Sequence, residues 1–561
     1  MTRTRIILLC ALALFVAFVA YFPLTNTDIW WHLAAAREML SRGAILRADP
    51  FAFTLDAARW IDIHWLFQLA AYGVHGIGGA FGLVAVKCVV FAAACVVLCV
   101  VFPGTRYTAV AAALCAVLMY EARYLVLARP VVVTVACMAL YVWVLERYHA
   151  QGRARFLLVL AGVQIAWTNS QGLFALGPAI AGAYWAGDTL ERWTRSLDRH
   201  EAVARWGPFD RALTVSLGLV IVACVVNPYG FQGAVFPLKL LGRIDPAHAN
   251  IYARNVSENA PLLSLAGPDA RYVYAMFAVT GLAFLSFALN RRAFRWAHVL
   301  LLIGFACLAY MAKRNILLYF TASVPVLAHN FASEGARATL ARFGVLKHRG
   351  VRTAAMAVVC AVVILHAVSH ARIVSRYPSG TAVSPFRVPV AAVDYLAKYP
   401  VSGHIFNSIR YGGYLIWRLY PEKKVFIDGR LIIRSPRFFA EYLAILENPY
   451  LFPGVAERFN ITHVVLPTAI FERYFGLVKW LYNAPGWDLV FADGASVLFV
   501  REDLHEGEGL DLSRGADLRK VKDEIARQWG GDTAILEESV LYLDRLCLYL
   551  AGNECVILGL Y

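Results

Sequence analysis

Residues 6–32 of the chain read IILLCALALFVAFVAYFPLTNTDIWWH. The first part, residues 6–24, carries no charged side chain and is long enough to cross a bilayer as a helix, which takes about 20 apolar residues. Arg3 and Arg5 precede it, and the carboxylate of Asp28 follows shortly after its end. The stretch lacks a small-residue cleavage site, so we interpret it as a retained membrane helix and not as a signal peptide.

The composition of the whole chain agrees with this interpretation. Of the 561 residues, 60% are hydrophobic and only 16% are charged, which is more apolar surface than a soluble core can bury. The formal net charge of +15 would suit nucleic acid, but the arginines lie in short loops between apolar blocks. Arginines in such loops set membrane topology, so we exclude a nucleic-acid partner.

Eleven apolar blocks predict about eleven transmembrane helices. They cover residues 6–24, 80–102, 107–120, 130–145, 156–168, 173–186, 213–226, 272–289, 296–311, 316–328 and 354–369. A further apolar stretch, residues 65–77, is too short to span comfortably. We predict that it forms a shallow helix leading into the second crossing.

Arginine-rich loops alternate with arginine-poor ones along the chain. The basic groups are Arg147, Arg153 and Arg155; Arg192, Arg195, Arg199, Arg205 and Arg211; Arg291, Arg292 and Arg295; and Arg337, Arg342, Lys347, Arg349 and Arg352. By the positive-inside rule this places the N-terminus in the cytoplasm and the C-terminal region outside. Two long loops, residues 25–64 and 227–271, then lie outside, where a binding site is most readily built.

Two regions are predicted: a transmembrane module, residues 1–370, and a C-terminal domain, residues 371–561. The second mixes strand-like runs (424–427, 463–466, 496–500) with helical ones (390–398, 510–528, 533–550), which predicts a small α/β domain. The expected fold class is therefore a polytopic α-helical membrane protein with a C-terminal α/β extracytoplasmic domain.

The first outer loop opens with Asp28, which is followed by Trp30, Trp31 and His32. Tryptophans are typical of the membrane interface, and the helical spacing of residues 28–40 predicts a helix lying in that interface. A carboxylate there is placed to meet a lipid-linked substrate. The alternative is that Asp28 is only a negative charge at a helix start, favoured by the helix dipole.

Two further acids lie in the same loop. Asp49 precedes Pro50, a pattern typical of turns. Asp62 is two residues from His64, and the two side chains share a face only if the backbone is extended there. Each acid is a candidate for acid/base chemistry, and each is equally a candidate for a structural polar group.

Basic side chains on the outer side suit phosphate. Lys87 lies inside an apolar block, where an ionisable group is either functional or reaches the interface through its long stem. Arg129 begins an outer helix, and Arg314 lies with Asn315 between two crossings. Arginine matches phosphate oxygens with a fork of donors, although a single arginine also anchors to lipid headgroups.

The C-terminal domain holds a second set of candidates. Arg410 and Tyr411 precede Gly412-Gly413, which lacks the spacing and lysine of a phosphate loop. Residues 425–430 read VFIDGR, which predicts a strand ending in an exposed acid, Asp428; the alternative is a pair of packing turns. Nine of eleven cysteines lie in apolar blocks, and Cys547 and Cys555 are a candidate disulfide in an outside domain.

In this layout the sequence resembles the GT-C superfamily of membrane glycosyltransferases. The resemblance extends to the first loop, where Asp28 is followed by His32-Leu33-Ala34-Ala35-Ala36-Arg37-Glu38-Met39-Leu40 and Gly43. The loop is similar to that of bacterial transferases related to the aminoarabinose and protein-mannosyl transferases. The pattern Asn227-Pro228-Tyr229-Gly230 and the pair Arg314-Asn315 look like features of poorly characterised bacterial members.

The resemblance implies inverting transfer of a sugar from a polyprenyl-phosphate donor to a glycan, lipid or protein acceptor, at the outer face of a bacterial inner membrane. It gives Asp28 the part of the loop acid, with Asp49 and Asp62 as further catalytic candidates. It carries no metal site, because Asp28 is followed by Ile29 and Trp30 and not by the Asp-x-Asp pattern of the oligosaccharyltransferase branch; a divalent metal stays open. The side chains expected to contact substrate are His32, His64, Lys87, Arg129, Arg314, Asn315, Arg410 and Tyr411.

Two other functions fit parts of the pattern. A flippase or transporter of a lipid-linked saccharide would also need arginines and an aromatic outer cavity. It would need polar groups along a path through the bundle as well, and apart from Lys87 the crossings are poor in ionisable residues. A scaffold that recruits partners would be favoured by a repeat or a charged tail, and the sequence has neither.

Overall fold

The computed structural model describes residues 2–55, 58–198, 210–242, 251–291, 294–342, 349–377, 381–399, 402–468, 471–505, 509–529 and 532–551. The chain forms two compact units. The helical unit comprises Met1–Phe22, Ile63–Ala70 and Ile77–Arg372, and the mixed unit comprises Pro23–Asp62, Ala71–Gly76 and Ile373–Tyr561. Most of the first long loop, up to Asp62, therefore belongs to the same unit as the C-terminal region.

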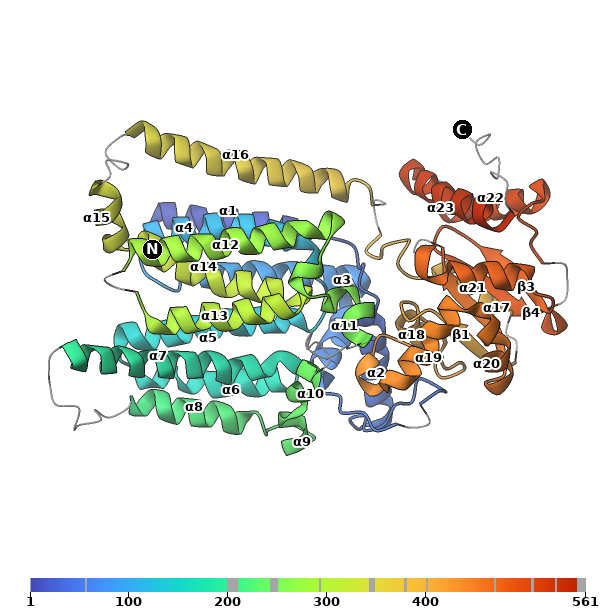
Figure 1. Cartoon of the computed structure of the whole chain (residues 1–561), viewed down its shortest axis with the longest axis horizontal. Coiled ribbons are helices and arrows are strands. Elements are labelled where there is room, and N and C mark those ends of the chain that lie inside the picture. Colours follow the sequence, from blue (N-terminus) through green and yellow to red (C-terminus); the bar gives the residue numbers. More distant parts are fainter. Residues whose placement is uncertain are drawn as a thin grey trace. The chain divides into compact units, whose positions relative to one another are not determined.

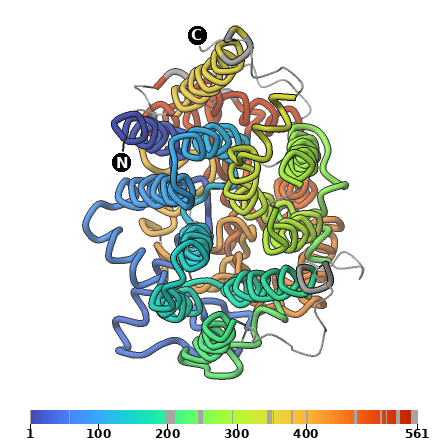
Figure 2. The backbone as a smooth tube through the Cα atoms, turned by 90° about the vertical axis from the view of Figure 1, so that its left-hand side faces the viewer, coloured from blue at the N-terminus to red at the C-terminus, as the bar shows by residue number. Residues whose placement is uncertain are grey.

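The helical unit is a bundle of long helices that run side by side (Figure 1), and Figure 2 looks along them. Its longer helices are α1 (Arg3–Ala20), α3 (Trp65–Cys99), α4 (Thr105–Glu121), α5 (Val131–Gln151), α6 (Leu158–Thr168), α7 (Leu176–Asp198), α8 (Arg211–Ala223), α12 (Ala270–Leu289), α13 (Trp296–Met311), α14 (Ile316–Ala332) and α16 (Arg349–Val374). Shorter ones are α9 (Phe231–Ala234), α10 (Phe236–Gly242), α11 (Ile251–Asn255) and α15 (Glu334–Arg342).

Each of the eleven predicted apolar blocks contains a helix. Within the described residues, five helices are long and apolar enough to cross a membrane, or six if the bent pair Lys313–Ala332 and Glu334–Arg342 counts as one span. The predicted shallow helix at residues 65–77 is the first part of α3, and non-helical backbone at Gly79 (φ 56°, ψ −148°) separates it from the crossing that follows.

Helix α14 is the core of the bundle. Every residue from Ile316 to Ala328 is buried, which is expected of a helix that is apolar on all sides. It packs against α4, α12 and α13, and α13 packs in turn against α7.

One buried carboxylate links three of these helices. Glu146 on α5 accepts hydrogen bonds from the hydroxyl of Tyr184 on α7 (2.8 Å) and from Nε2 of His298 on α13 (2.8 Å). Arg295, which precedes α13, pairs with the second oxygen of the same carboxylate. A buried charge is tolerated when it is paired and hydrogen-bonded, so this cluster fixes the register of α5, α7 and α13.

The mixed unit combines helices with a four-stranded sheet. Its helices are α2 (Asp28–Arg42), α17 (Val390–Lys398), α18 (Gly412–Leu419), α19 (Pro436–Glu447), α20 (Phe452–Arg458), α21 (Phe471–Asn483), α22 (Gly515–Trp529) and α23 (Thr533–Ala551). The strands β1 (His404–Asn407), β2 (Ile461–Pro467), β3 (Trp487–Ala492) and β4 (Ser496–Arg501) lie in the order β1-β2-β4-β3. The pair β1 and β2 is parallel and the other two pairs are antiparallel.

Residues of the first loop join this unit through backbone pairing. Leu24 forms a parallel bridge with Val383, and Ala52 forms one with Val425, which also bridges Ile405 on β1. The strand predicted at residues 424–427 is therefore wrong, because only Val425 has bridge partners there. The strands predicted at 463–466 and 496–500 and the helix predicted at 390–398 are confirmed.

The predicted disulfide lies at the end of this unit. Cys547 is buried on α23 and is disulfide-bonded. Its predicted partner, Cys555, lies outside the described residues, so the pairing of these two cysteines stays a prediction.

Candidate functional site

Asp28 is the first residue of α2 and is half-buried. Its backbone N–H donates to the side-chain oxygen of Asn26 at 3.1 Å, which fixes the start of the helix. A carboxylate in the first turn is favoured by the positive end of the helix dipole. The helical expectation for residues 28–40 is confirmed, since α2 runs to Arg42.

An aromatic cluster continues from this helix start. His32 is buried and its ring lies on that of Trp31, with centroids 3.6 Å apart. Trp31 also contacts Trp60, from the end of the first loop, at 6.1 Å between centroids. Of these rings, that of His32 is the one predicted to contact substrate.

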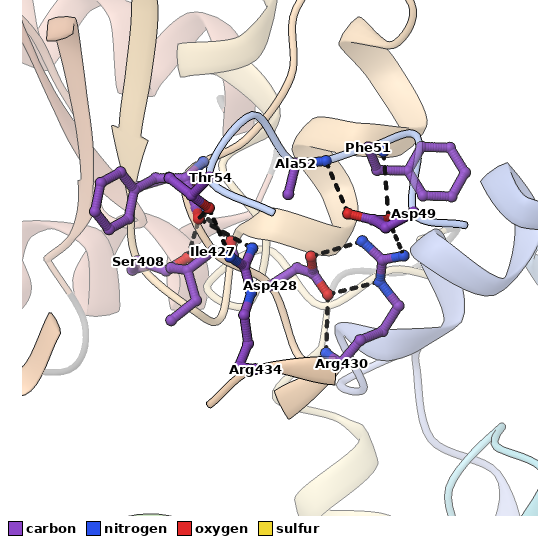
Figure 3. Close-up of polar contacts among 11 residues, drawn as sticks. Asp49, Phe51, Ala52, Thr54, Ser408, Ile427, Asp428, Arg430 and Arg434 are labelled. Atoms are coloured by element: carbon purple, nitrogen blue, oxygen red, sulfur yellow. Dashed lines mark hydrogen bonds and ion pairs between the residues drawn. The ribbon is translucent and has the colours of Figure 1, made fainter. Parts of the chain in front are cut away.

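Asp49 takes part in a buried ion triad (Figure 3). Nη1 of Arg430 donates to Asp49 at 2.5 Å, and the Nε and Nη2 atoms of Arg430 donate to the two oxygens of Asp428, both at 2.8 Å. Asp49 also accepts from the backbone N–H groups of Phe51 (3.3 Å) and Ala52 (3.1 Å). The expectation of an exposed acid at Asp428 is therefore wrong: its side chain is 1% exposed and is held by Arg430.

The side chains of the triad are buried, and burial strengthens the attraction between their charges. Burial alone would raise the pKa of Asp428, but the charge of Arg430 outweighs burial and lowers it. Burial likewise opposes the charge on Arg430, and the two carboxylates overcome it and raise the pKa of that guanidinium. Arg430 also lies over the ring of Trp60, with its guanidinium carbon 4.7 Å from the ring centroid.

Hydrogen bonds to backbone groups hold the turn that carries Asp428 and Arg430. Asn407 on β1 donates to the carbonyl of Ile427 (2.7 Å) and accepts from the N–H of Phe426 (2.9 Å). The carbonyl of Phe426 accepts from Thr54 of the first loop (2.6 Å) and from Arg434 (3.1 Å). Figure 3 shows the first loop and this turn facing each other through these groups.

Asp62 and His64 fall in different units. Asp62 is fully buried in the mixed unit. His64 precedes α3 in the helical unit, where its Nε2 lies 3.3 Å from the side-chain oxygen of Gln171. Asp62 and His64 therefore have different neighbours.

The basic candidates of the helical unit have identifiable contacts. Lys87 is 4% exposed on α3 and donates to the carbonyl of Phe22 at 3.2 Å. Arg129 forms an ion pair with Glu258, and Arg314 lies close enough to interact electrostatically with both residues. Glu258 is buried, and the charges of Arg129, Arg314 and Lys313 together lower its pKa against that burial. Arg129 is therefore ion-paired to this carboxylate, and Arg314 and Lys313 act on it through their charges.

The remaining candidates have local partners. Asn315 is buried and donates to the carbonyl of Leu308 at 2.8 Å, which closes the turn between α13 and α14. Tyr411 is buried and donates to the carbonyl of Ala495, in the turn between β3 and β4. Burial and the nearby Arg387 lower the pKa of Arg410 to about 10.

The described part of the chain contains no group of three or more His, Cys, Asp or Glu side chains arranged to hold a metal ion. The pairing of Asp49 with Arg430, and the contacts of Arg434 and Thr54 beside it, were not predicted from the sequence. The available signal was charge: Asp428, Arg430 and Arg434 lie within an otherwise apolar run, and buried charges need partners.

Comparisons with known proteins bear on the fold. No family model matches the chain, and no curated protein matches its sequence. The archaeal oligosaccharyltransferase AglB from Archaeoglobus fulgidus, in complex with an inhibitory peptide and a dolichol-phosphate, is similar with a TM-score of 0.54 and 13% identity over 85% of this chain and 71% of that chain. The apo form of the Archaeoglobus fulgidus oligosaccharyltransferase gives 0.52 and 14% over the same shares.

A further solved structure spans nearly the full length of both proteins. ArnT from Cupriavidus metallidurans, bound to undecaprenyl phosphate, covers 90% of this chain and 99% of its own, with a TM-score of 0.35 and 12% identity. At 13% and 14% identity, the likeness to the two oligosaccharyltransferase structures concerns the fold alone. The chain therefore shares its fold with the archaeal oligosaccharyltransferase.

Proposed function

We propose that the protein is a glycosyltransferase that moves a sugar from a polyprenyl-phosphate donor to an acceptor hydroxyl at the outer face of the membrane, with inversion. The fold supports the reaction class, because the similar archaeal oligosaccharyltransferase was solved with a dolichol-phosphate. The observation that carries the proposal is the placement of Asp28: it starts α2 at the aromatic cluster and is accessible, whereas the other two acids of the loop are not.

Asp28 is the general base in this proposal. It removes the proton from the acceptor hydroxyl as the acceptor oxygen attacks the anomeric carbon, and the polyprenyl phosphate leaves from the opposite face. Asp49 is poorly suited to that step because Arg430 and two backbone N–H groups occupy its carboxylate. Asp62 is 0% exposed, so it cannot meet an acceptor without rearrangement.

The departing phosphate needs positive charge. Arg129 is ion-paired to Glu258 and Arg314 interacts electrostatically with both, and we assign these two guanidiniums to the lipid phosphate. Lys87 is a second candidate for this contact, since its ammonium group has a backbone carbonyl as its protein partner. The acceptor is a glycan, lipid or protein, and membrane lipids surround the helical unit.

Turnover of a defined donor tests the proposal. The purified full chain in nanodiscs is offered a panel of synthetic undecaprenyl-phosphate monosaccharides, and release of undecaprenyl phosphate is measured with water or added glycans as acceptor. We expect release with at least one sugar, and Asp28→Asn should lower it by about 10²–10⁴-fold, the usual contribution of a general base.

Binding is measured in parallel by native mass spectrometry with undecaprenyl phosphate. Asp28→Asn should bind this lipid as the parent does, whereas Arg314→Gln should weaken binding. Parental turnover in Asp28→Asn would remove Asp28 from the reaction. A flippase would move the intact lipid across the bilayer and release no undecaprenyl phosphate from any donor.

A further inference from the structure

Gly429 lies against the proposed general base. A methyl group added at Gly429 would place its carbon well inside 3.0 Å of Oδ1 of Asp28, a separation that Cβ atoms essentially never show. Nε1 of Trp31 would lie 3.8 Å from the same carbon, an ordinary contact. The Asp28 carboxylate therefore occupies the space that any other residue at position 429 would fill.

The backbone on the Gly429 side has little freedom to withdraw. Arg430, the next residue, donates its backbone N–H to Oδ1 of Asp428 at 2.8 Å, and its side chain is bound to Asp428 and Asp49. The preceding carbonyl of Ile427 accepts from Asn407. The turn is therefore fixed immediately before and after the glycine.

The backbone on the Asp28 side is fixed as well. Helix α2 packs against α18, and a Cβ atom at Gly413 would lie 2.6 Å from the carbonyl oxygen of Thr27, so the helix start touches the beginning of α18. With both backbones held, the group that can move when position 429 gains a side chain is the end of the Asp28 side chain.

We propose that Gly429 is a positioning residue: by having no side chain, it sets the rotamer and location of the Asp28 carboxylate. This inference rests on the proposed function, since it concerns the group assigned there as base. The backbone conformation does not itself require a glycine at this position, because the φ angle of Gly429 is not positive. A displacement near 1 Å of a catalytic group is enough to cost about 100-fold in rate.

Two other glycines make suitable comparisons. A Cβ atom at Gly454, on α20 of the same unit, meets nothing within 4 Å, so Gly454→Ala is the matched control. At Gly412 the same atom would lie 2.7 Å from the Cα of Asp428, a collision with backbone that no side-chain movement relieves. Gly412→Ala should therefore impair folding, whereas Gly429→Ala should fold.

The experiment measures release of undecaprenyl phosphate from the synthetic donor panel by the full chain, with kcat and KM obtained separately. Gly429→Ala should lower kcat about 100-fold, leave KM for the donor within about twofold, and match Gly454→Ala in thermal stability and in binding of undecaprenyl phosphate. In an Asp28→Asn background, Gly429→Ala should add less than about threefold further loss, because the group it displaces no longer acts.

Three outcomes distinguish the positioning role of Gly429 from the proposed function of Asp28 as the base. If Asp28→Asn loses turnover while Gly429→Ala keeps parental kcat, the positioning role is wrong and the proposed function stands. If Asp28→Asn keeps parental turnover, both fall. If Gly429→Ala folds poorly, the thermal midpoint is measured with Asp28→Ala added: recovery of stability confirms that the carboxylate occupies the space, and no recovery overturns the inference.

Discussion

Arg430 binds Asp49 across 381 residues of sequence, with Nη1 donating to the carboxylate at 2.5 Å in a fully buried site. The same guanidinium binds Asp428 through two further hydrogen bonds. A fork of donors satisfying two carboxylates is a geometry that arginine provides and lysine does not. The first loop is therefore joined to the C-terminal part of its unit by charge as well as by backbone pairing.

Arg430→Lys should destabilise the mixed unit. A lysine ammonium cannot make all three hydrogen bonds, so at least one buried carboxylate is left without its partner, at a cost of about 2–4 kcal/mol. The matched control is Arg437→Lys, whose parent arginine is 89% exposed and pairs with Glu441 one helical turn away at 3.0 Å. In detergent, the thermal melting midpoint should be clearly lower for Arg430→Lys and almost unchanged for Arg437→Lys. Equal midpoints would contradict the structural role of the triad.

Glu146→Gln should destabilise the helical unit. The amide keeps the size of the side chain and one oxygen acceptor, but it removes the charge that pairs with Arg295 and puts a donor where the carboxylate had its second oxygen. We expect a loss of about 3 kcal/mol, as for other broken buried pairs. Glu334→Gln is the control, because that pair with Arg106 (3.2 Å) is exposed and is expected to contribute less than about 1 kcal/mol. A melting midpoint for Glu146→Gln no lower than that of Glu334→Gln would count against the cluster.

Asp493 should make stability depend on pH in one narrow range. Burial raises the pKa of this carboxyl to about 6, against hydrogen bonds from the backbone N–H groups of Ala495 and Ser496. The folded state therefore binds a proton between about pH 4 and pH 6 that the unfolded state does not, so this contribution to stability is full at about pH 4 and is lost as pH rises through 6.

Asp493→Asn keeps an oxygen acceptor and cannot ionise. At pH 7.5 it should be more stable than the parent, on the order of 2–3 kcal/mol, and at pH 4 it should match the parent. Hydrogen exchange of residues 493–500 measures this difference at both pH values. The same difference at pH 4 and pH 7.5 would show that the Asp493 carboxyl titrates normally.

Topology is predicted from the arginine pattern: the Trp193 end of α7 faces the cytoplasm and Ser513 faces outside. Trp193→Cys and Ser513→Cys, each in a background without the exposed Cys10, Cys307 and Cys360, should react with a membrane-impermeant maleimide from opposite sides. Labelling of both from one side would contradict the predicted orientation.

Local patterns in the sequence predicted the elements well and their partners poorly. The apolar blocks and the period of residues 390–398 depend on neighbours in sequence, so α17 and the long helices were predictable. Residues 424–427 have the composition of a strand, yet Val425 bridges only Ala52 and Ile405. Whether an apolar run finds strand partners depends on distant backbone, which local composition does not encode.

The candidate site was predictable in the same partial sense. Asp28 stood out because a carboxylate directly follows a membrane helix. Asp49 and Asp62, further along the same loop, were equally candidates for chemistry or for structure, and their burial separates them from Asp28. The contact between Asp28 and Gly429 had no signal in the sequence, because a glycine in a turn is ordinary and the two residues are far apart in the chain.

The pairing of Asp49 with Arg430 also sets an order of events during synthesis. Translation at about 5–20 residues per second separates the emergence of these two residues by roughly 20–80 s. Until the later segment arrives, the first loop has neither its buried guanidinium nor its backbone partner Val425. Nascent chains arrested before residue 425 should therefore leave residues 23–62 open to protease, and chains arrested well beyond residue 430 should protect them. The first long loop of the chain is therefore among the last segments to reach its native state.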